Sequence, residues 1–207
     1  MTPAYYTVLS GDLVGSSHYQ GNEYDTLITI LKQGLNTICS HYGGEFDMYR
    51  GDAFQCIFSK QSAPLMMALL TRLFLKQYGI DARISEAHGP IEHYRGEIKS
   101  ATGAALIASG KGLDNIKNHR LALTIIGQEL SASFALNIAF VDNILSHVTK
   151  KQAQALYLYF LTPGIEHAQI AQMLDTSREN VTKLLNTGNY RLLDEFVKVA
   201  TKEMVNE

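Results

Sequence analysis

Residues 45–59, EFDMYRGDAFQCIFS, contain two short runs with strand character, Glu45–Arg50 and Ala53–Ser59, on either side of Gly51-Asp52. Two residues between such runs predict a β-hairpin, and glycine at the first central position predicts a type II′ turn. The hairpin decides the fold because it supplies the middle of a β-α-β-β-α-β order of elements.

The elements around the hairpin follow from hydrophobic spacing and from glycine and proline stops. Before it, a buried first strand is expected, and then a helix that Asp25 caps and Gly43-Gly44 ends. After it, we expect a helix, a strand that His88-Gly89-Pro90 breaks, a strand or loop, a helix and a last strand. The expected ranges are 5–9, 25–42, 61–78, 80–87, 91–98, 101–118 and 121–126.

The composition changes near residue 127, beyond which every expected element is helical. We therefore predict an α+β protein in three parts. Residues 1–127 form a ferredoxin-like palm domain, 128–149 hold a connecting helix, and 150–207 form an all-α domain.

The overall composition excludes several classes of protein. Of 207 residues, 46% are hydrophobic and 18% charged, and the net charge is -2, which argues against disorder and against coating nucleic acid non-specifically. Cys39 and Cys56 have no metal-ligand spacing and are too few for a disulfide framework. With no signal peptide and no apolar run of membrane-spanning length, a cytoplasmic protein without membrane contact is expected.

Two aspartates, Asp12 at the end of the first strand and Asp52 at the hairpin tip, are candidate metal ligands. Neighbouring strands would let their carboxylates converge, and paired carboxylates suit divalent cations that bring nucleotide phosphates. The adjacent glycines would let backbone N–H groups approach phosphate oxygens. The alternative is that each aspartate merely stabilises a turn. The candidate nucleotide-binding residues are Gly11, Gly15, Ser16, Gly51 and Lys111.

Residues 5–126 resemble the palm-type domain of class III nucleotidyl cyclases and GGDEF-type enzymes. The resemblance is closest to SatD-like proteins, whose pattern couples a strand ending in Gly-Asp to a later Gly-Asp-x-Phe-Gln hairpin. The segments that carry it are GDLVGS at 11–16, GDAFQ at 51–55, ARISEAHGPI at 82–91 and SATGAAL at 100–106. The resemblance implies that Asp12 and Asp52 hold Mg²⁺ or Mn²⁺ with a nucleotide.

The chain departs from the cyclase pattern in its last palm helix. Cyclases carry an Asn and an Arg there that support the transition state, and the corresponding positions here are Ile107 and Lys111. Ile107 cannot donate a hydrogen bond, and Lys111 lacks the bidentate fork of arginine. Ser17-His18 also stand where SatD-like proteins often have an Arg. These departures indicate nucleotide binding without catalysis.

Residues 166–185 have the spacing of two helices that cross at a tight turn. Ile170, Leu174 and Val181 would pack inward, Asp175-Thr176 would form the turn, and Ser177 would cap the second helix. The stretch resembles the helix-turn-helix of sigma-factor region 4, which implies DNA binding. The candidate DNA-binding residues are Ser177, Arg178, Thr182, Lys183, Asn186 and Arg191.

A packing or dimerisation role is the alternative for this helical pair. Residues 147–207 contain seven Lys or Arg and seven Asp or Glu, so their net charge is zero, whereas DNA-binding modules are usually basic. Three functions therefore stand. The first is a transcriptional regulator with a nucleotide- or ligand-sensing, non-catalytic palm domain and a DNA-binding output, acting as a homodimer. The second is an active nucleotidyl cyclase or nucleotidyltransferase with a regulatory helical region. The third is a non-catalytic scaffold.

Overall fold

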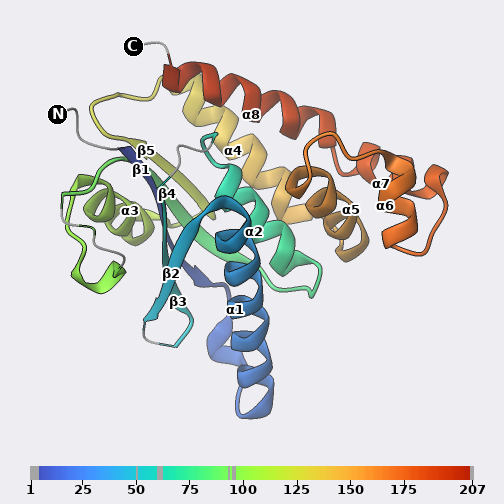
Figure 1. Cartoon of the computed structure of the whole chain (residues 1–207), viewed down its shortest axis with the longest axis horizontal. Coiled ribbons are helices and arrows are strands. Elements are labelled where there is room, and N and C mark those ends of the chain that lie inside the picture. The colour runs from blue at the N-terminus through green and yellow to red at the C-terminus, as the bar shows by residue number, and fades with distance from the viewer. Residues whose placement is uncertain (1–4, 50, 60–62, 93, 95–96, 206–207) are drawn as a thin grey trace.

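The computed structural model describes residues 5–49, 51–59, 63–92, 94 and 97–205. Its centre is one five-stranded sheet in the order β2-β3-β1-β4-β5 (Figure 1). The strands are β1 (Tyr5–Leu13), β2 (Gly44–Tyr49), β3 (Ala53–Phe58), β4 (Ala82–Pro90) and β5 (Leu121–Ile125). The palm helices are α1 (Asn22–Tyr42), α2 (Met66–Lys76) and α3 (Ala104–Asn115), with short 3₁₀ turns at Ser16–His18 and Ile98–Ser100.

The sheet has the expected ferredoxin-like topology with one strand added. Strand β1 pairs antiparallel with both β3 and β4, and β5 extends the sheet by pairing parallel with β4. The hairpin between β2 and β3 is present, but Tyr49 pairs with Ala53, so three residues and not two separate the strands. The two-residue type II′ turn is therefore wrong, although Gly51 does have the positive φ, 88°, that a tight turn requires. Arg50 lies outside the described residues.

Each face of the sheet is covered by helices. Helices α1 and α2 bury a large apolar cluster against one face, to which Leu9 and Phe54 contribute from the strands. Helix α3 lies on the other face over a smaller cluster that includes Val8 and Ala87. Alternation of side chains along the strands places Leu9 and Val8 on opposite faces.

Two expected boundaries are wrong, those at Asp25 and at His88-Gly89-Pro90, and of the two alternatives for 91–98 the described residues do not show the strand. Helix α1 begins at Asn22, so Asp25 lies inside its first turn, where a carboxylate favours the positive end of the helix dipole. Strand β4 runs through His88-Gly89-Pro90 because β1 pairs with it along its whole length, up to Tyr5 opposite Pro90. The described part of 91–98 holds no strand, and residues 93, 95 and 96 of that range lie outside the described residues.

Every element of secondary structure described after β5 is a helix, as expected. Ser131 caps α4 (Ala132–His147) by accepting a hydrogen bond from the backbone N–H of Phe134. The other four helices are α5 (Lys150–Leu161), α6 (His167–Met173), α7 (Arg178–Thr187) and α8 (Tyr190–Val205). Helix α8 returns alongside α4, where the rings of Phe134 and Phe196 stack 5.8 Å apart, so α6 and α7 project at the far end from the sheet (Figure 1).

None of the helices in the described ranges has both the length and the apolar character needed to cross a membrane.

Candidate functional site

Asp12 lies on β1 directly opposite Arg83 on β4, and the two side chains form an ion pair. The guanidinium of Arg83 donates to both carboxylate oxygens of Asp12, with Nε 2.8 Å from Oδ1 and Nη2 bonded to Oδ2. Such bidentate pairs are the strongest form of this interaction. Both oxygens that were expected to bind a metal are therefore bound to an arginine.

Asp52 lies at the hairpin tip in the same neighbourhood. The hydrogen bond to Asp12 raises the pKa of Arg83 above its ordinary value, and the charges of Asp12, Asp52 and Asp114 raise it further. Arg83 is thus bonded to one candidate metal ligand, Asp12, and is influenced by the charge of the other, Asp52. Among the described residues, no group of three or more His, Cys, Asp or Glu side chains is arranged to hold a metal ion.

Of the glycines expected to bind a nucleotide, Gly15 and Gly51 lie in turns, and Gly11 lies close to the side chain of a neighbouring strand. Gly15 has a positive φ of 73° and precedes the 3₁₀ turn that begins at Ser16. A Cβ on Gly11 would lie only 2.4 Å from the Phe54 ring, and one on Gly51 only 2.3 Å from the Tyr24 hydroxyl. Gly11 is therefore required by packing and Gly51 by its positive φ of 88°, whether or not a phosphate approaches them.

Helix α3 packs closely on the sheet through small residues. Ser109 exchanges a hydrogen bond of 2.9 Å with Ser10 on β1, and Gly112 lies over Ser85 with no room for a methyl group. The opposite side of the helix carries Ile107, which is 59% exposed, and Lys111, which is also exposed. Lys111 therefore points away from the sheet on which Asp12 lies.

The α6–α7 unit, residues 167–187, has the local structure that the sequence predicts. Ser177 caps α7 by accepting a hydrogen bond from the backbone N–H of Asn180, and Asp175 takes the left-handed backbone conformation in the turn. Ile170 and Val181 are fully buried between the two helices, and the imidazole of His167 lies 2.9 Å from the hydroxyl of Thr182. The turn angle is thus fixed by a buried contact and a polar one.

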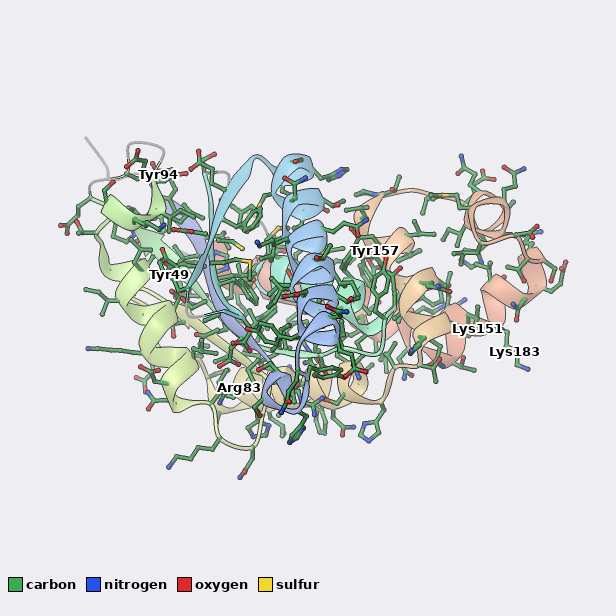
Figure 2. All side chains as sticks on the ribbon, turned by 90° about the horizontal axis from the view of Figure 1, so that it is seen from below. Tyr49, Arg83, Tyr94, Lys151, Tyr157 and Lys183 are labelled. Carbon is green, nitrogen blue, oxygen red and sulfur yellow. The ribbon has the colours of Figure 1, made fainter. Side chains whose placement is uncertain are left out.

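Most of the expected DNA-binding residues are exposed. Helix α7 packs against α5, α6 and α8, and Figure 2 places Lys183 at the end of the molecule far from Arg83. Thr182 is half-buried by its contact with His167, so it is less available than expected. The exposed residues are Ser177, Arg178, Lys183, Asn186 and, on α8, Arg191.

No protein-family model matches this chain, and no curated protein matches it significantly. Several solved structures are similar. A guanylyl cyclase domain of the RhoGC fusion protein from Blastocladiella emersonii is 14% identical, with a TM-score of 0.47 over 58% of this chain and 79% of that one. The guanylate cyclase domain of RhGC from Catenaria anguillulae is 16% identical, with a TM-score of 0.46 over 58% and 78%. The adenylyl cyclase CyaB from P. aeruginosa is 17% identical, with a TM-score of 0.40 over 51% and 69%.

These neighbours are nucleotidyl cyclases. The fold of this chain is defined by its own strand order, β2-β3-β1-β4-β5.

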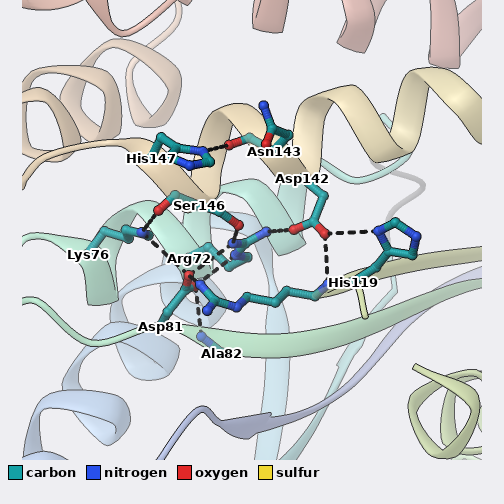
Figure 3. A network of polar contacts seen from close by, with 10 residues as sticks. Arg72, Lys76, Asp81, Ala82, His119, Asp142, Asn143, Ser146 and His147 are labelled. Atoms are coloured by element: carbon teal, nitrogen blue, oxygen red, sulfur yellow. Dashed lines mark hydrogen bonds and ion pairs between the residues drawn. The ribbon is translucent and has the colours of Figure 1, made fainter. Parts of the chain in front are cut away.

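Sequence reasoning missed a buried polar network between the palm domain and α4 (Figure 3). Arg72 on α2 is fully buried and donates to Asp81 through Nε at 2.8 Å and Nη2 at 3.0 Å, and to Asp142 on α4 through Nη1 at 2.5 Å. Arg120 also pairs with Asp81, and Lys76 donates to the backbone carbonyl of Ser146 at 2.6 Å. The sequence signal was an arginine in the middle of a mostly apolar helix.

A second buried group, also missed, holds the start of α2. Glu86 on β4 accepts backbone N–H bonds from Leu65 at 2.6 Å and Ala68 at 3.3 Å, and His88 lies 2.7 Å from it. Glu86 and His88 are at most 1% exposed. The carboxylate of Glu86 thus accepts hydrogen bonds from backbone N–H groups at the start of α2 that have no partner within the helix. The sequence signal for this group was a glutamate within a buried strand.

Proposed function

We propose that this protein is a ligand-responsive DNA-binding regulator. Its palm domain senses a nucleotide without catalysing cyclisation, and its α6–α7 unit is the DNA-binding helix-turn-helix. The observation that carries the proposal is the exposed polar side of α7, with Arg178, Lys183 and Asn186 free of the sheet.

The α7 side chains have the chemistry that DNA requires. Arg178 lies in the first turn of α7, where recognition helices reach base edges, and its guanidinium suits guanine. Lys183 lies farther along the helix and suits phosphate, a contact that is independent of sequence. A single unit with so little net charge would bind weakly, so we expect a homodimer with its two α7 helices about 34 Å apart.

The test is a selection from random duplexes, followed by fluorescence anisotropy on the selected sequence at several salt concentrations. Arg178→Ala should cost about 1–3 kcal/mol of binding free energy and relax the preference at one position. Lys183→Ala should weaken all sequences alike and lower the salt slope by about 1. Lys32→Ala, at an exposed position on α1, removes the same charge as Lys183→Ala and should leave binding unchanged. The proposal is wrong if no duplex is selected with or without nucleotide, or if Lys32→Ala and Lys183→Ala weaken binding equally.

Two features argue against catalysis. Asp12 is ion-paired, so a metal would have to displace Arg83 from this partly exposed pair before it could bind the carboxylate. Ile107 presents an apolar side chain to solvent where a transition state would need a hydrogen-bond donor. Loss of one such donor typically lowers the rate by about 10²–10³-fold.

Active nucleotidyl cyclase is the second candidate, because Gly11 pairs with Phe54, a register that puts Asp12 beside the end of the hairpin that carries Asp52. Incubation with ATP or GTP and Mn²⁺, with mass spectrometry of the products, separates the two functions. We expect little or no cyclic nucleotide. Turnover that Asp52→Asn abolishes would establish the cyclase instead.

A further inference from the structure

A cavity of about 390 Å³ lies where the palm domain meets the helical region, and positive charge dominates its lining. Lys76 comes from the last turn of α2, Arg120 from the residue before β5, and Lys150 from the first turn of α5. Asp81 is the one carboxylate among the lining residues. Three cations from distant parts of the chain therefore face one anion.

The cations keep donors that their present partners do not use. Arg120 bonds Asp81 through Nη1, and the described part of the chain offers no acceptor to its Nε or Nη2. Lys150 has no ion-pair or hydrogen-bond partner there either. Its side chain crosses Gly79 so closely that a Cβ on Gly79 would lie 2.7 Å from Cε and 3.1 Å from Nζ. The ammonium of Lys150 thus lies beside Gly79 at the wall of the cavity.

The charge in the cavity is not balanced. Burial lowers the pKa of Lys76 and the charges of Arg72 and Arg120 lower it further, although Asp81 acts in the opposite direction. Ammonium groups that are desolvated beside other cations are costly unless an anion joins them. The positive end of the α5 dipole adds to the same potential.

Most of the other lining residues are apolar. Val14, Leu27, Ile80 and Val148 form the walls, Thr149 adds a hydroxyl group, and Tyr19 adds a partly exposed phenol ring. The volume lies within the range of small-molecule sites, about 300–1,000 Å³. An occupant would need an anionic head for the cations and a small apolar or aromatic body for the walls.

We propose that this cavity binds a small phosphate ester, with its dianionic head between Lys76, Arg120 and Lys150 and its body against the apolar walls. The site differs from the Asp12 and Asp52 site and does not depend on the proposed function. The site lies between the palm domain and the helical region, and two of its lining residues, Asp81 and Arg120, belong also to the network that joins α2 to α4 (Figure 3). A ligand bound in this cavity would therefore influence the position of the helical region relative to the sheet.

The probes are inorganic phosphate and phenyl phosphate, titrated into the full chain at constant ionic strength and followed by ¹⁵N-amide NMR. We expect saturable shifts centred on Gly79 and Lys150, and at least tenfold tighter binding of phenyl phosphate than of phosphate. Lys150→Glu should weaken phenyl phosphate at least tenfold, and Tyr19→Ala should weaken phenyl phosphate but not phosphate.

The control is Lys151→Glu, which makes the same charge change at the next residue, also exposed but outside the lining (Figure 2). The proposal is overturned if Lys150→Glu and Lys151→Glu have equal effects, since binding would then reflect general charge. It is also overturned if phenyl phosphate binds no better than phosphate, or if the shifts centre elsewhere. Thermal unfolding of each variant shows whether it is folded, and Lys150 has no partner among the described residues whose loss would unfold the protein.

Discussion

Replacing Arg72 with methionine should destabilise the protein more than almost any other single substitution. The methionine fills similar length, but it removes the four hydrogen bonds of 2.5–3.2 Å that Arg72 donates to Asp81, Asp142 and Ser146. Both carboxylates stay buried, and breaking a buried pair by removing one partner costs about 3–5 kcal/mol. Since domains are stable by about 5–15 kcal/mol, this is a large share of the total.

The assay is urea unfolding followed by circular dichroism. With an m-value of about 2 kcal/mol/M, the Arg72→Met midpoint should fall by about 2 M. Lys198→Met is the matched control, because Lys198 pairs with Asp194 at 2.6 Å but on the surface of α8, where such pairs add little to stability. The midpoint of that control should not move.

A second variant tests the cause of the destabilisation. Adding Asp142→Asn to Arg72→Met removes the charge of the buried carboxylate that has lost its arginine partner, so the double variant should lose less than the sum of the two single variants, by about 1 kcal/mol or more. The reasoning is refuted if Arg72→Met shifts the midpoint no more than Lys198→Met does. It is also refuted if the two substitutions at 72 and 142 are strictly additive.

Three further results are expected. Burial would raise the pKa of Asp81, but the hydrogen bonds and charge of Arg72 outweigh burial and lower this pKa overall. The stability that Asp81 contributes is therefore complete above its unfolded-state pKa of 3.8 and is lost as the pH falls below that value. Melting temperatures measured over a series of acidic pH values check this. Tyr157→Phe should stabilise the protein by about 1 kcal/mol in urea unfolding, because the buried hydroxyl of Tyr157 has no hydrogen-bond partner in the described structure. Burial also raises the pKa of this hydroxyl to about 12. A loss of stability would mean that the hydroxyl does have a partner. Arg83→Gln should free Asp12 and strengthen Mn²⁺ binding at least tenfold by electron paramagnetic resonance, whereas unchanged affinity would show that Arg83 does not compete with the metal.

The sequence determined the order of the elements and several of their ends. The hairpin at Gly51-Asp52 and the runs on either side specified β-α-β-β-α-β, because turn residues and hydrophobic spacing act over a few neighbours. The cap of α7 at Ser177 was predictable for the same reason, since a hydroxyl bonds a backbone N–H three residues away. The end of β4 was not predictable, because the length of this strand follows from its pairing with β1, in which Tyr5 lies opposite Pro90, 85 residues away in sequence.

The tertiary structure alone decided which charges meet. Asp12 faces Arg83 because β1 and β4 are antiparallel neighbours in one register, and a shift by one residue would put the two side chains on opposite faces. Arg72 and Asp142 are 70 residues apart and are joined only where α4 crosses α2. Periodicity assigns a charged residue to the solvent side of a helix, and nothing local reveals that a carboxylate from a distant helix will be buried beside it. Local chemistry thus fixed the elements, while the pairings that hold them together, and the cavity between them, arose from contacts that form only in the folded chain.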